Sequence, residues 1–144
     1  MSPEFTQLVR LLSPSQREKI TIEIHCVDLI ADPGAFRFVH AYLSNIGFEL
    51  ALDGTDLYSF PEFARHDVGF NYVKVGWNEA LENDLALGDL QLFDRAVSQL
   101  GADKVILCHC GTPEALQFGH RVGVQYFQGR HIDEILSPES RRTN

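Results

Sequence analysis

The sequence predicts an α/β fold in which β-strands and α-helices alternate and the strands form a parallel sheet. First, about five apolar stretches with strand character alternate with stretches whose apolar residues keep helical spacing. Second, three junctions repeat one form, in which a helix ends at a glycine and a strand follows, at Gly47, Gly101 and Gly123. Such alternation is typical of parallel sheets with right-handed crossovers. It does not distinguish an open sheet from part of a barrel.

The N-terminal third gives the first unit of this plan. Glu4–Leu12 carries apolar residues at helical spacing, and the Ser13-Pro-Ser triplet closes that helix. Lys19–Ile24 alternates apolar and polar residues, which is typical of a half-buried strand. Asp32, followed by proline, suits the start of a second helix, and Gly47 ends it.

Two further strands are expected in the middle of the chain. Phe48–Leu52 is the first and ends at the Asp53-Gly54 pair, and Asn71–Val75 is the second. Between them, Ser59 and Glu62 have the spacing of a capping box, which predicts a short helix. After the second strand, one helix is predicted from an apolar stripe: Leu90, Phe93, Val97 and Leu100.

The stretch Lys104–Gly129 predicts a complete βαβ unit. Val105–Leu107 is its first strand, and Thr112, followed by proline and glutamate, suits the start of its helix. The second strand ends at Gln128, and His131–Leu136 reads as a last short helix. Polar residues therefore follow the carboxyl ends of both strands, which is where catalytic and ligand-binding residues lie in parallel sheets.

The composition is that of an ordinary globular protein, with 44% hydrophobic and 22% charged residues. We expect one α/β domain over residues 1–136 and a flexible tail over 137–144. The net charge of −8, without any basic run, argues against nucleic-acid binding. No apolar run approaches the ~20 residues of a membrane span, and the first residues lack the features of a signal peptide. We therefore expect no membrane contact and a cytoplasmic location.

Five segments follow, in order and spacing, the motifs of one protein family. They are Thr21–Pro33, compared with L-E-I-T-E and its helix; Ile46–Gly54, with G-x-x-x-A-L-D-D-F-G; Tyr72–Val75, with Y-I-K-I-D; Val105–Leu116, with V-I-A-E-G-V-E-T-P-E-Q-L; and Gly123–Gly129, with the closing G-x-x-x-x-Q-G. Over nearly its whole length the chain thus resembles an EAL domain. Each motif alone has low specificity, whereas five in the right order are more specific.

EAL domains are TIM-like barrels that hydrolyse cyclic di-GMP with two divalent metals held by carboxylates. The resemblance implies that this chain corresponds to the second half of the barrel, about strands four to eight. The half with the Glu-Ala-Leu signature and the metal-binding Asn has no counterpart here. Four polar positions of the family are retained: Glu23, Asp53, Lys74 and Gln128. The resemblance leaves two interpretations open: these residues contact the nucleotide, or they only hydrogen-bond one another at the carboxyl edge of the sheet.

Three carboxylate positions of the family are replaced. Cys26 and Cys108 stand where the family has Glu, and Gly54 stands where it has the second Asp of D-D. Two-metal hydrolysis needs hard oxygen ligands to hold both ions and to lower the pKa of a bridging water. We therefore expect no catalytic residues, and no Mg²⁺ or Mn²⁺ unless another chain completes the site. The first hypothesis is a degenerate, non-catalytic signalling module that binds a protein partner or a second copy of itself and retains at most weak affinity for cyclic di-GMP.

Half of a closed barrel would leave two unpaired strand edges and an uncovered inner face. We therefore expect a protein partner or a homodimer. The alternative hypothesis is a cyclic di-GMP phosphodiesterase whose missing carboxylates come from another chain.

A third hypothesis is a thiol-ligated metal site formed by Cys26, Cys108 and Cys110 at two strand tips. An obvious fourth ligand is missing, and in extended strands His25 and Cys26 would point to opposite faces. A disulfide between Cys108 and Cys110 would have poor geometry, because residues i and i+2 of a strand lie roughly 6.6 Å apart. Buried thiols that fill the core are the simpler interpretation.

Overall fold

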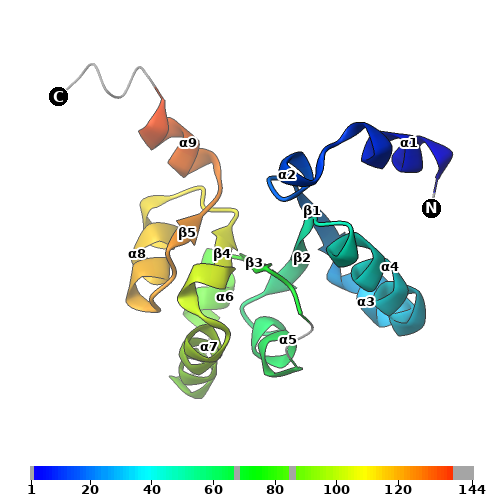
Figure 1. Cartoon of the computed structure of the whole chain (residues 1–144). Helices are drawn as coiled ribbons and strands as arrows, with labels where there is room; N and C mark the ends of the chain where they lie inside the picture. The colour runs from blue at the N-terminus through cyan, green and yellow to red at the C-terminus, as the bar shows by residue number, and fades with distance from the viewer. Residues whose placement is uncertain (1, 67–68, 85–86, 138–144) are drawn as a thin grey trace. The chain divides into compact units, whose positions relative to one another are not determined.

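The computed structural model describes residues 2–66, 69–84 and 87–137. Its five strands form one parallel sheet in which each strand lies beside the next strand along the chain, with helices between successive strands (Figure 1). The predicted fold class, an α/β chain with a parallel sheet, is therefore confirmed. The chain divides into two compact units, Met1–Asp53 and Gly54–Asn144.

The first unit contains four helices, one strand and most of a second strand among its described residues. They are α1 (Pro3–Leu11), α2 (Pro14–Arg17), β1 (Thr21–His25), α3 (Cys26–Ala31), α4 (Pro33–Asn45) and the beginning of β2 (Glu49–Asp56). Side chains cap two of its helices: Ser2 accepts a hydrogen bond from the Phe5 amide, and Asp32, at the predicted helix start, accepts one from the Ala35 amide at 2.9 Å.

Strands β1 and β2 pair in parallel, with Ile24 opposite Leu52 and His25 opposite Asp53. Because side chains alternate along a strand, Leu50 and Leu52 share one face of the pair, and both are fully buried. Glu23 and Asp53 lie on the opposite face. This pairing therefore separates an apolar face from a face with carboxylates.

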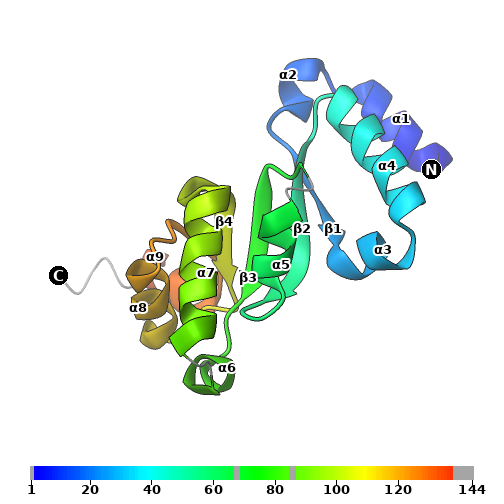
Figure 2. The ribbon, with the colours of Figure 1, turned by 90° about the horizontal axis from the view of Figure 1, so that it is seen from below.

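The second unit continues the alternation. Its elements are α5 (Phe60–His66), β3 (Tyr72–Gly76), α6 (Glu79–Asp84), α7 (Leu87–Leu100), a 3₁₀ turn (Ala102–Lys104), β4 (Val105–Cys108), α8 (Pro113–Arg121), β5 (Tyr126–Phe127) and α9 (Arg130–Leu136). Helices α5 and α7 lie side by side against the sheet (Figure 2). Three fully buried rings join α5, α7 and α8, because Phe93 lies 5.1 Å from Phe60 and 5.6 Å from Phe118 between ring centroids.

Three short helices, α2, α3 and α6, differ from the expectation. Each has only four to six residues, too few for a helical apolar period to be visible in the sequence. Local caps define them instead. Ser13 and Gln16 form a reciprocal capping box at α2, so that Ser13 begins a new helix as well as closing α1.

Two further details of the prediction were wrong. Strand β2 continues past Asp53 to Asp56, and Gly54 lies within it with a positive φ of 84°, a conformation that glycine adopts without strain. The helix after Ser59 is present and begins at Phe60, but the side chains of Ser59 and Glu62 do not form the predicted capping box. The Ser59 hydroxyl bonds Asp56, and the Glu62 carboxylate bonds Arg65 and His66.

Candidate functional site

The four retained polar residues are distributed over both units. Glu23 is exposed in the middle of β1, and Asp53 is half-buried in β2, opposite His25. In the second unit, Lys74 is buried in β3, with 8% of its surface exposed, and Gln128 is exposed directly after β5. Within the first unit the two carboxylates share one face of the β1–β2 pair.

The backbone of the second unit positions Lys74 and Gln128. The buried Thr55 hydroxyl donates a 2.6 Å hydrogen bond to the Lys74 carbonyl. The Gln128 amide donates to the Leu107 carbonyl at 2.9 Å, and the Gln128 carbonyl accepts from the Cys110 amide at 3.1 Å. Gln128 is thus attached to the carboxyl end of β4.

Cys108 lies on the same face of the sheet as Lys74. Because side chains alternate along a strand, Lys74 and Gly76 share one face of β3, and Gly76 pairs with Cys108 of β4. Cys108 is buried, with 6% of its surface exposed. A buried thiol therefore stands at this position of the face, where the family motif has a carboxylate.

From the sequence, Cys26 is expected to be part of an extended strand, but it does not continue strand β1. It is the first residue of α3, and His25 is the N-cap, whose Nδ1 accepts a hydrogen bond from the Val27 amide at 3.2 Å. Cys26 is buried as well. The expected opposition of His25 and Cys26 on two strand faces was wrong, because the chain turns into a helix at this point.

The tip of β4 also departs from strand geometry. His109 has a φ of 62°, in the left-handed region, so Cys108 and Cys110 are not residues i and i+2 of one strand. Cys110 is fully buried, and its Sγ donates to the Leu107 carbonyl at 3.2 Å. Burial raises the pKa of the Cys110 thiol, and a hydrogen bond with the Gln128 backbone lowers this pKa by a smaller amount. The thiol form, which is a poor nucleophile and a poor metal ligand, is thereby favoured.

The hypothesis of a thiol-ligated metal site requires a cluster of ligating side chains. In the part of the chain that the structure describes, no group of three or more His, Cys, Asp or Glu residues is placed to hold a metal ion. All three cysteines are free thiols and buried. These thiols fill the core of the two units.

One constellation was missed by sequence reasoning. The Trp77 indole donates to one carboxylate oxygen of Glu82 at 3.0 Å, and Arg121 donates to the other at 2.8 Å. Trp77 is 7% exposed, and its amide bonds the Cys108 carbonyl. Glu82 therefore joins the end of β3 to α6 and α8. No sequence signal indicates a pair 39 residues apart.

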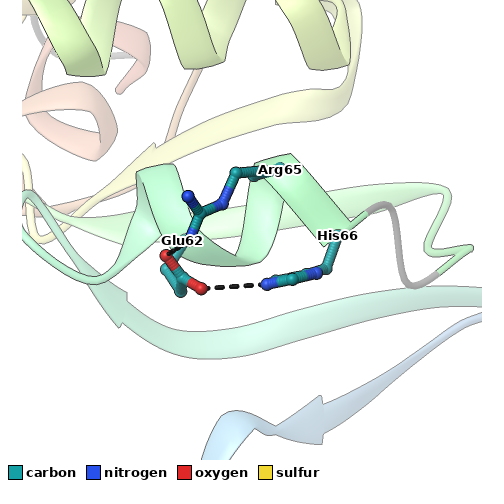
Figure 3. Close-up of polar contacts among 3 residues, drawn as sticks. All are labelled: Glu62, Arg65 and His66. Carbon is teal, nitrogen blue, oxygen red and sulfur yellow. Dashed lines mark hydrogen bonds and ion pairs between the residues drawn. The ribbon is translucent and has the colours of Figure 1, made fainter.

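A second polar cluster lies on the exposed surface of α5. Glu62 pairs with Arg65 and, at 2.9 Å, with His66 (Figure 3). The pKa of Glu62 is lowered, first by the Arg65 hydrogen bond and then by that of His66. Exposed pairs of this spacing stabilise a helix slightly. A shallow groove of about 260 Å³ beside it includes Leu57 and Leu92.

Among the described residues, no helix is both long enough and apolar enough to cross a bilayer.

The comparisons with known proteins give a likeness of fold. No family model matches the sequence, and no curated protein matches it either. Among solved structures, the chain is similar to Vibrio cholerae LapD, described as S helix-GGDEF-EAL in the apo state, with a TM-score of 0.66 and 20% sequence identity. The match covers 92% of this chain and 34% of that one, so this chain spans about a third of its length. The chain therefore has an EAL-like fold, matching a fragment of a TIM-like barrel.

Proposed function

We propose that this chain is a non-catalytic, EAL-like module of bacterial cyclic di-GMP signalling, which binds the nucleotide weakly and acts through a protein contact. The observation that carries the proposal is the likeness of fold to a GGDEF-EAL chain over 92% of this sequence. The retained Glu23, Asp53, Lys74 and Gln128 support it, because they occupy the polar positions of the family motifs.

The local structure at the three replaced positions supports a silent site. Cys26 and Cys108 are buried thiols, which supply neither the charge nor the oxygen atoms of a carboxylate. Gly54 has a positive φ of 84°, at which a side chain is strained. The donor set among the described residues does not fit a pair of Mg²⁺ ions, and we derive no hydrolytic step through them.

Lys74 is the residue that we expect to contribute most to nucleotide affinity. Its ammonium group is a point charge suited to a phosphate, and its backbone is fixed by Thr55. Gln128 adds an exposed amide with both donor and acceptor atoms. Together they would contact a phosphodiester without cleaving it.

Calorimetric titration with cyclic di-GMP tests this proposal. Lys74→Met should weaken binding by about tenfold or more, because a hydrogen bond to a charged group contributes about 1.5–3 kcal/mol. Lys104→Met is the matched control, since Lys104 is exposed in the 3₁₀ turn and should leave binding unchanged. Circular dichroism of each variant verifies folding. If the parent chain gives no heat of binding, nucleotide binding is contradicted and the protein contact is the function that is left.

The alternative remains a phosphodiesterase completed by another chain, favoured by the common face of Glu23 and Asp53. In that case the two carboxylates would supply part of a metal site and the second chain the rest. Hydrolysis that appears only in a mixture of the two chains would distinguish it.

A further inference from the structure

The first unit contains an apolar groove with an acidic border. It has a volume of about 360 Å³ and lies between α3, α4 and the end of β1. Its apolar lining includes Ile24, Phe36 and Val39, and its two charged lining residues are Asp28 and Asp32. The volume is many times that of one water molecule, about 30 Å³ in the liquid. The groove therefore has room for more than one aliphatic side chain.

Apolar side chains continue beyond the groove onto the surface of the same unit. Val27, which is 58% exposed, precedes Ala31 of the groove by one turn of α3. Phe38 of α4 is 69% exposed. Exposed apolar side chains on the same helices as an apolar groove are typical of a protein-binding surface.

Helix α1 presents the complementary feature. Leu8 and Leu11 are exposed by 51% and 75%, and at a spacing of three residues they form one ridge. Arg10 lies in the last turn beside Leu11, and it is also exposed. Glu4, the acidic residue of α1, lies seven residues before Leu11, roughly 10 Å along the axis. The carboxyl-terminal end of α1 is thus apolar with a cation beside it.

We infer that the groove of one copy receives helix α1 of a second copy, with Leu8 and Leu11 in the groove and Arg10 facing Asp28. The inferred dimer has two-fold symmetry, so that this contact forms twice and the association closes at two copies instead of continuing head to tail. The apolar burial supplies the attraction, and the Arg10–Asp28 pair sets the orientation in which α1 lies. This inference rests on the proposed function, for which it names the protein contact.

Light scattering of the full chain over a concentration series tests the inference. The parent chain should approach twice its mass of 16.2 kDa as concentration rises. Val39→Glu places a charge in the groove and should weaken dimerisation by about tenfold or more. Ile135→Glu is the matched control, because Ile135 is comparably exposed, at 48% against 36% for Val39, but lies on α9. It should leave the dimer intact.

Charge reversal tests the orientation of α1. Arg10→Glu alone should weaken the dimer, and Arg10→Glu combined with Asp28→Lys should restore it. A monomer at every concentration, a dimer unaffected by Val39→Glu, or a double variant without restoration would overturn the inference. Nucleotide titration of the same samples separates the two proposals. A dimer that binds no cyclic di-GMP would support the dimer surface and contradict the nucleotide-binding proposal. A monomer that binds cyclic di-GMP would support nucleotide binding and overturn the dimer surface.

Discussion

At the residue scale, single hydrogen-bonding groups in this protein join elements that are distant in sequence. The Glu82 carboxylate accepts hydrogen bonds from Trp77 and Arg121, and the Gln128 carbonyl accepts one from the Cys110 amide. Gly129 allows this second junction, because a Cβ there would lie 2.4 Å from the Cys110 amide nitrogen. The sequence predicts Gly129 as the end of a strand, but the close approach that requires glycine depends on the three-dimensional structure.

Asp56 gives a pH-dependent prediction at this scale. Its Oδ1 accepts hydrogen bonds from the Tyr58 amide, the Ser59 amide and the Ser59 hydroxyl. Partial burial acts to raise the pKa of Asp56, but these bonds outweigh it and the pKa lies below its ordinary value of 3.8. A lowered folded-state pKa stabilises the fold above the unfolded pKa, and this contribution is lost as pH falls through the folded value.

The variant Asp56→Ala should therefore lower the free energy of unfolding by about 0.5–1.5 kcal/mol at neutral pH, because the part-buried Ser59 amide and hydroxyl lose their acceptor. The difference from the parent should shrink as pH falls below 3.8. Urea unfolding at a series of pH values measures it. A difference that stays constant down to the acid limit would show that the carboxylate charge is not involved.

At the element scale, the long helices and the strands could be predicted, whereas α2, α3 and α6, of four to six residues each, could not. Helices α4 and α7 each carry a buried apolar stripe over thirteen or fourteen residues, so their periodicity is visible in the sequence. Helix α3 depends on one cap by His25, a residue that rarely indicates a helix start. The Asp-Gly pair at 53–54 suggested a strand end, because it usually marks a turn.

The contact between α8 and β5 gives a prediction at this scale. Gly119 of α8 is buried, and a Cβ there would lie 2.3 Å from the ring of Phe127. Gly119→Ala should therefore lower the free energy of unfolding by about 1–3 kcal/mol, because the ring must shift in a packed core. Gly88→Ala is the matched control: Gly88 lies in α7 with nothing within 4 Å of the added atom.

The control should be neutral or slightly stabilising, because alanine favours a helix over glycine by up to about 1 kcal/mol. Chemical denaturation of both variants measures the difference. Equal effects of the two substitutions would contradict the close packing of α8 on β5.

At the scale of the whole molecule, the sequence predicts the fold class because strand and helix patterns alternate along the entire chain. It also predicts which positions of the family motifs are retained and which are replaced. It does not predict the surroundings of those positions, since the burial of Lys74 and Cys108 depends on strands far apart in the sequence. The apolar groove of the first unit was likewise not foreseen, because α3 was not.

The most direct test of a silent, EAL-like site is incubation of the purified chain with cyclic di-GMP in Mg²⁺ or Mn²⁺, followed by separation of the nucleotides. We predict that the cyclic dinucleotide stays intact, because two buried thiols and a glycine stand at carboxylate positions. Formation of the linear dinucleotide by the parent chain, and its loss in Asp53→Asn, would contradict this account.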